Sequence, residues 1–129
     1  MNKRILVSGS IIGLLAVILG AFAAHGLEKS ISQDAIETFQ TGVRYQMYHA
    51  IVLLFVGSAT VLRAKTKKRI FYALILGVLF FSGSIYGLAT NELTGFDFKT
   101  IGFITPIGGL FFIISWILMT IDFLKFKQE

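Results

Sequence analysis

Long apolar segments alternate with short charged segments along the chain. The apolar segments cover about residues 5–24, 45–63, 70–91 and 101–121. A helix needs roughly 20 such residues to cross a hydrocarbon core of about 30 Å. None of the segments alternates with the period of two that is typical of a barrel strand, and a backbone in lipid otherwise satisfies its hydrogen bonds as helix. The pattern predicts an all-α integral membrane protein, a four-transmembrane-helix bundle that forms a single domain over residues 1–129.

The segment after the first apolar run has an amphipathic pattern. Residues 30–33 have the S-x-x-Q form of a capping box, and Asp34 and Glu37 follow where a helix dipole favours acids. Apolar residues then recur at helical spacing: Ile31, Ala35, Ile36, Phe39 and Val43. This predicts an amphipathic helix over about 31–43 that lies on the outer surface between spans one and two. The alternatives are a helix that runs on into the second span, bending near Gly42, and a partly ordered polar loop.

The basic residues are unevenly divided between the two sides that four spans create. Nine of the 12 Lys and Arg lie in the N-terminus, the second connection and the C-terminus. The positive-inside rule therefore places both termini in the cytoplasm. The net charge of +5 is thus an excess on the inner face and does not indicate a nucleic-acid surface. Contact with anionic lipid is predicted for five side chains of the second connection: Arg63, Lys65, Lys67, Lys68 and Arg69.

The first apolar segment also has features of a secretory signal peptide. Lys3 and Arg4 form a basic start, and residues 21–23 resemble an Ala-x-Ala cleavage site. The apolar run is longer than the usual core of such a peptide, so an uncleaved first span is favoured.

Composition narrows the classes of function. The 129 residues are 55% hydrophobic and only 15% charged, against roughly 25% charged residues in an average soluble domain. This excludes an ordinary soluble enzyme and a disordered chain. The sequence has no Cys, which excludes a disulfide, a thiolate nucleophile and a cysteine metal site. It also has no HExxH, GxSxG, P-loop or dinucleotide motif, so no catalytic residue, cofactor or metal site is assigned.

Small residues recur at spacings that let helices approach closely in lipid. Residues 9–13 form a GxxxG, and further small residues follow in the first, third and fourth spans. The helix-packing positions are Gly9, Gly13, Gly20, Gly83, Gly87, Gly108 and Gly109. Each one fits packing within the bundle, and the presence of two such faces also predicts a homo-oligomer.

Polar side chains at span depth gather toward the outer leaflet in this topology. They are His25, Tyr45, Gln46, Tyr48, His49, Ser82, Ser84, Tyr86 and Thr105. The inner half holds an aromatic belt that includes Trp116, and Pro106 either follows a helix cap at Thr105 or kinks the fourth helix. Intramembrane ionisable residues are functional candidates, but for His49 structural hydrogen bonding is favoured. Two His without a third ligand make no convincing zinc or iron site.

Four motifs occur in order along the four spans. They are residues 20–27 (GAFAAHGL), 44–50 (RYQMYHA), 81–86 (FSGSIY) and 104–109 (ITPIGG), the last followed by Trp116. Together they resemble a small bacterial membrane-protein family catalogued as domain of unknown function 423, whose usual form has Gly at the position of Ala23. The resemblance implies a bacterial inner-membrane protein with four helices. It supplies no catalytic residue.

Three functions are compatible with these patterns. The leading hypothesis is a non-enzymatic membrane protein that stabilises or organises the cell envelope through lipid contact, self-association or a partner protein. The alternative is a small oligomeric channel or transporter with an outer-leaflet polar vestibule. The second alternative is a lipid, quinone or metal binder that uses His49.

Overall fold

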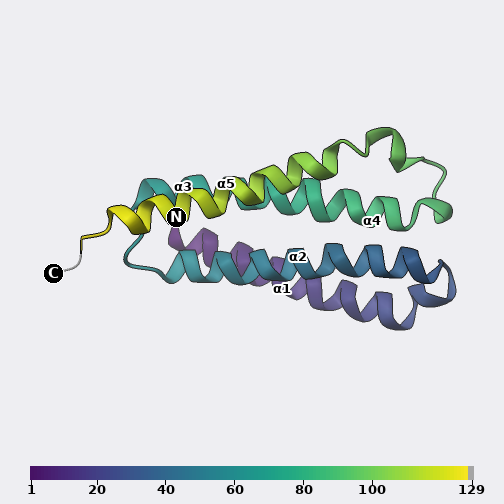
Figure 1. Ribbon diagram of the computed structural model, residues 1–129. Helices are drawn as coiled ribbons and strands as arrows, with labels where there is room; N and C mark the ends of the chain where they lie inside the picture. Colours follow the sequence, from purple (N-terminus) through teal and green to yellow (C-terminus); the bar gives the residue numbers. More distant parts are fainter. Residues whose placement is uncertain (128–129) are drawn as a thin grey trace.

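The computed structural model describes residues 1–127, and this part of the chain is helical with no strand. Figure 1 shows long helical rods that lie side by side and run in alternating directions. The elements are α1 (Asn2–His25), α2 (Gln33–Ser58), α3 (Ala64–Gly77), the π-helical turn η2 (Val78–Ser82), α4 (Gly83–Ala89) and α5 (Ile104–Lys125). Short 3-10 turns occupy the connections: η1 (Leu27–Lys29), η3 (Asn91–Leu93) and η4 (Phe98–Ile101).

The rods form two helical hairpins (Figure 1). In one hairpin α1 packs along α2, and in the other α5 packs along α3 and η2. Contacts of α2 with α4 and η2 join the two hairpins. The N-terminus, the 59–63 connection and the end of α5 lie at one end of the molecule, and η1, η3 and η4 lie at the other (Figure 1).

Three of the rods are long and apolar enough to cross a membrane. They are residues Asn2–Lys29, Ala64–Ala89 and Ile104–Lys125. The second helix does not meet this description, because Arg44, Gln46 and His49 interrupt its apolar residues. The four expected segments are therefore present as four rods, of which three have clear spanning character.

The expected surface helix 31–43 and the expected span 45–63 form one continuous helix, α2. The Oγ atom of Ser32 accepts a hydrogen bond from the Ala35 amide at 3.2 Å, so the cap lies two residues later than Ser30. The helix passes through Gly42 and ends at Ser58. A Cβ atom at Gly42 would lie 2.7 Å from the Tyr86 ring, because this half of α2 packs against α4. That packing explains why the amphipathic segment does not form a separate surface helix.

The start of α5 differs from both expectations for Thr105 and Pro106. The helix begins at Ile104, with Phe103 as its N-cap, so Pro106 lies in the first turn. First-turn amides have no partner within the helix, and a proline is tolerated there without a kink. The Thr105 hydroxyl instead contacts a side chain of α4, as described below.

Two hydrophobic clusters hold the helices together. The first cluster joins all four rods through buried residues: Ile5, Leu53, Val56, Leu62, Ile70, Leu74, Phe112 and Met119. The second cluster packs the η1 turn and the end of α4 onto α2: Ala23, Leu27, Ile31, Ile36, Phe39 and Ala89. The polar side chains described next lie between these two clusters.

Candidate functional site

A chain of hydrogen bonds crosses three helices near the middle of the molecule. The Tyr86 hydroxyl of α4 donates to Oε1 of Gln46 on α2 at 2.6 Å. The Nε2 atom of Gln46 donates in turn to the Ile12 carbonyl of α1 at 2.9 Å. Gln46 is 4% exposed, so it is shielded from both lipid and water. This chain stabilises the contact between the two hairpins.

Two serines of the third rod make a second set of polar contacts. Ser82, which is fully buried, donates from Oγ to the Gly42 carbonyl at 2.7 Å. The hydroxyls of Ser84 and Thr105 share a hydrogen bond at 2.5 Å, and Ser84 also donates to the Phe81 carbonyl at 3.0 Å. These bonds tie η2 and α4 to α2 on one side and to α5 on the other.

The His49 ring is buried and fully engaged. Its Nδ1 lies 2.7 Å from the Tyr45 carbonyl and acts as donor, since a carbonyl only accepts. Its Nε2 accepts from the Trp116 indole N–H at 3.2 Å. The ring stacks on Phe112 with centroids 3.7 Å apart and an interplanar angle of 2°. Both nitrogens of the neutral ring are therefore occupied, which leaves neither free for a metal or a substrate proton.

The structure separates His25 from the expected outer-leaflet site, whereas Tyr45 remains beside His49, with ring centroids 6.3 Å apart. His25 is exposed at the end of α1, away from His49 in the middle of α2. Tyr45 and Tyr48 are 39% and 50% exposed and contact each other edge to ring. Residues 1–127 contain no group of three or more His, Asp or Glu side chains placed to hold a metal ion.

A polar cluster at the opposite end was not assigned from the sequence. The carboxylate of Asp122 on α5 accepts from the Arg63 amide at 2.8 Å and from Arg63 Nε at 2.5 Å. Asp122 thereby caps the start of α3 from a distant part of the chain. Lys67 is buried and donates from Nζ to Oδ1 of Asn2 at 3.3 Å. The sequence contains one sign of this cluster. Asp122 directly follows the apolar run 101–121, at the end of the bundle where the basic connection 63–69 is expected.

The five basic residues of the second connection therefore fall into two groups, those bonded within the protein and those that are exposed. The Arg63 guanidinium is bonded to Asp122 although its side chain is 61% exposed, and Lys67 points into the protein. The remaining predicted lipid contacts are exposed: Lys65, Lys68 and Arg69.

The glycines identified by spacing have different surroundings. Added Cβ atoms at Gly9, Gly13 and Gly20 would lie 3.0 to 3.6 Å from side chains of α2. Those at Gly87 and Gly108 would overlap Phe98 and the backbone of Phe81, respectively. Gly109 has ordinary contacts with the Phe81 ring, and Gly83 has open space around it. The GxxxG of residues 9–13 thus packs within the hairpin.

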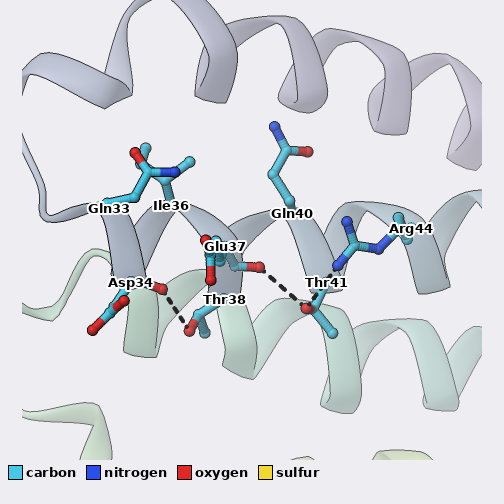
Figure 2. Close-up of a pocket in the computed structure, with 8 residues that line it drawn as sticks. All are labelled: Gln33, Asp34, Ile36, Glu37, Thr38, Gln40, Thr41 and Arg44. Atoms are coloured by element: carbon cyan, nitrogen blue, oxygen red, sulfur yellow. Dashed lines mark hydrogen bonds between the residues drawn. The ribbon is translucent and has the colours of Figure 1, made fainter.

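An open polar hollow of about 680 Å³ lies along the first half of α2 (Figure 2). All its lining side chains come from this one helix: Gln33, Asp34, Ile36, Glu37, Thr38, Gln40, Thr41 and Arg44. Figure 2 shows the Arg44 guanidinium directed at Thr41, where Nη2 donates to Oγ1 at 3.2 Å. All of these residues except Arg44 lie in the amphipathic helix predicted over 31–43, and the sequence indicated no site among them.

The family model described as "Protein of unknown function (DUF423)" matches residues 19–109, which include Gln46, His49 and Tyr86. The chain belongs to the DUF423 family. A UPF0382 membrane protein of Staphylococcus haemolyticus is 39% identical to it, with 96% of this chain and 98% of that protein covered. The UPF0382 membrane protein YwdK of Bacillus subtilis is 38% identical, covering 96% and 98%. The UPF0382 inner membrane protein YgdD of Escherichia coli is 33% identical, covering 99% and 95%.

No solved structure matches this DUF423 chain. Its three apolar helices and its relatives, which are described as membrane proteins, agree on its membrane character. The resemblance seen in the four motifs is therefore confirmed.

Proposed function

We propose that this DUF423 protein is a non-enzymatic membrane protein that organises the bacterial cell envelope through lipid contact and self-association. One observation carries the proposal. Within residues 1–127, every buried side-chain nitrogen and oxygen has a hydrogen-bond partner. A catalytic or ligand-binding centre needs polar groups that are free to meet a substrate, whereas a satisfied network specifies how helices pack.

The proposed location is the cytoplasmic membrane, with four crossings and both termini in the cytoplasm. The proposed orientation is supported by exposed basic residues at one end of the molecule, which holds the N-terminus, the 59–63 connection and the end of α5 (Figure 1). These residues are Lys3, Arg4, Lys65, Lys68 and Arg69. Cytoplasmic loops carry such an excess. The packing of the second helix along α1 supports a fourth crossing beside α1.

The proposed lipid contact uses the exposed part of the basic connection. Each basic residue near an anionic surface contributes about 1 kcal/mol of attraction. Lys65, Lys68 and Arg69 are available for this contact, whereas Lys67 and Arg63 are bonded within the protein.

Native mass spectrometry from mild detergent tests the proposal. The wild type is compared with a Lys65→Gln/Lys68→Gln/Arg69→Gln variant and with a His25→Ala/His49→Ala variant. We expect a defined oligomer that carries anionic lipid, loss of that lipid in the first variant, and no change of bound species in the second. A stoichiometric small molecule that is lost with the histidines would contradict the proposal, as would a solute-specific flux in liposomes.

The hollow on α2 favours a second candidate function, an oligomeric channel or transporter. Its polar lining would face a shared water-filled path if several copies surrounded it. Light-scattering measurements of solute flux into proteoliposomes distinguish the two candidates. Flux that is abolished by Thr41→Leu but retained in the exposed control Leu110→Ala would establish the channel.

A further inference from the structure

We infer that one face of α2, formed by Glu37, Thr38, Thr41 and Arg44 and here called the α2 stripe, binds a second copy of this chain within the membrane. The inference rests on the proposed self-association and names its surface. Four observations support it: the depth of Arg44, its exposure, its unused donors and the composition of the stripe.

Arg44 lies near the middle of the apolar length of the molecule. Its neighbour Gln46 bonds the Ile12 carbonyl, and Gly20 faces Val43. Arg44 is therefore level with the interval 12–20 of α1, whose apolar run covers 5–24. On the other side, Gly42 accepts from Ser82, which lies near the centre of the 70–91 run. At 1.5 Å per helical residue, Arg44 is within about 5 Å of the midpoint of these runs.

The same level of the molecule faces lipid. The α1 side chains Leu14, Val17 and Ile18 are 59%, 60% and 53% exposed there, as lipid-facing residues would be. Arg44 is exposed on the adjacent helix. An arginine at the centre of a spanning helix costs roughly 2.5–3.5 kcal/mol on insertion scales, and such residues almost always face protein or a water-filled cavity.

Most of the hydrogen-bonding capacity of Arg44 is unused. Within residues 1–127 its side chain makes one hydrogen bond, from Nη2 to Thr41 Oγ1. A guanidinium carries five N–H donors in a fixed fork. This contrasts with Arg63, which has Asp122 as a charged partner. Further acceptors must therefore come from outside this copy of the chain.

The composition of the stripe fits a second copy of itself. Thr38 and Thr41 are small polar residues of the type that permits close helix approach and interhelical hydrogen bonds in membranes. The Arg44 guanidinium lies at the level of Thr41, to which it donates within one copy. In a parallel pair of α2 helices, the hydroxyl of the partner's Thr41 lies at the same level. Glu37 lies seven residues before Arg44, about two turns or 10 Å along the helix axis, and adds negative charge to the same face.

Site-directed cross-linking of the full chain in native membranes tests this surface. The chain has no Cys, so each variant carries one thiol. We expect Thr38→Cys, an exposed position of the stripe that leaves the Thr41 hydroxyl in place, to form a disulfide-linked dimer of this chain on mild oxidation. The matched controls Leu14→Cys on α1 and Leu110→Cys on α5, which are 59% and 54% exposed, should remain monomeric. Equal dimer in all three variants, or monomer throughout, would overturn the inference.

A second measurement tests the role of Arg44. In the Thr38→Cys background, Arg44→Leu should abolish the dimer while thermal unfolding of the monomer is unchanged, and Arg44→Lys should retain it. Persistence of the dimer in Arg44→Leu would contradict the inference, as would cross-links only to a different protein. Solute flux is measured on the same samples, so a channel activity would disprove the proposed function without altering the cross-linking result.

Discussion

The Trp116 indole on α5 donates to Nε2 of His49 on α2 over 3.2 Å, between residues 67 positions apart in the chain. This bond occupies the one imidazole nitrogen that the Tyr45 carbonyl does not engage. It makes His49 part of the packing between hairpins, in which the Phe112 ring covers the imidazole face.

Trp116→Phe removes the donor and leaves a buried imidazole nitrogen without a partner. We expect the free energy of unfolding to fall by about 1–3 kcal/mol, the cost of an unsatisfied buried polar group. Thermal unfolding followed by circular dichroism in mild detergent measures the change. The control Phe103→Leu alters an aromatic residue that is 63% exposed on the same rod, and a similar loss there would contradict the assignment.

The Tyr86–Gln46 hydrogen bond should show energetic coupling across the two hairpins. A double-mutant cycle with Tyr86→Phe and Gln46→Leu isolates the pair from the other effects of each substitution. We expect a coupling of about 0.6 kcal/mol, the average for interhelical hydrogen bonds in a membrane protein, and at most about 1.7 kcal/mol. Additive effects of the two substitutions would show that the bond contributes nothing measurable.

Gly108 and Gly83 form a matched pair for helix contact. A Cβ atom at Gly108 would overlap the Phe81 backbone, so Gly108→Ala must push α5 away from η2. We expect a loss of about 1–3 kcal/mol in the free energy of unfolding. Gly83 has open space around it, and Gly83→Ala should instead add about 0.5–1 kcal/mol because alanine favours helix. Equal effects in a thermal unfolding assay would refute this packing.

Asp122→Asn tests the long-range cap of α3. The change keeps the shape of the side chain but removes the charge that Arg63 contacts through both its amide and its Nε. Charged hydrogen bonds contribute roughly 1.5–3 kcal/mol, and we expect a loss of that order in the free energy of unfolding. Asp34→Asn, at an exposed acid in the first turn of α2, is the control and should cost less than about 1 kcal/mol.

The connection 90–102 between α4 and α5 should loosen at low pH. The Lys99 amide and the Asn91 side chain donate to the Asp97 carboxylate and hold its pKa below the usual range. A lowered pKa in the folded state means that this stabilisation is present above the unfolded pKa of about 4 and is lost as the pH falls through the lower folded value. Protease cleavage of residues 90–102 should therefore rise at acidic pH, with an acid-stable protease. The variant Asp97→Asn should show a weaker pH dependence, and an unchanged one would disprove the role of Asp97.

Much of the architecture was predictable because it depends on local properties. Apolar runs and charged boundaries identified the rods, and the capping box at 30–33 indicated a helix start, although Ser32 and not Ser30 forms the cap. The π-helical turn η2 was not predicted. It lies where Gly108 of α5 contacts the backbone at Phe81, and a contact between distant segments leaves no local pattern in the sequence. The length of α2 was left open for a similar reason, since the contact of Gly42 with Tyr86 decides it.

The candidate site was predictable as a set of residues but not as a set of bonds. Spacing along each helix grouped Gln46, His49 and Tyr86 at similar depth. It could not pair His49 with Trp116, because topology assigned that tryptophan to an inner belt. Local patterns of apolar, charged and motif residues thus established the membrane character, the helical class and the family. Only tertiary packing decided which polar groups satisfy one another and which, such as Arg44, remain exposed, because hydrogen bonds between helices depend on rotation and contact that periodicity leaves undefined.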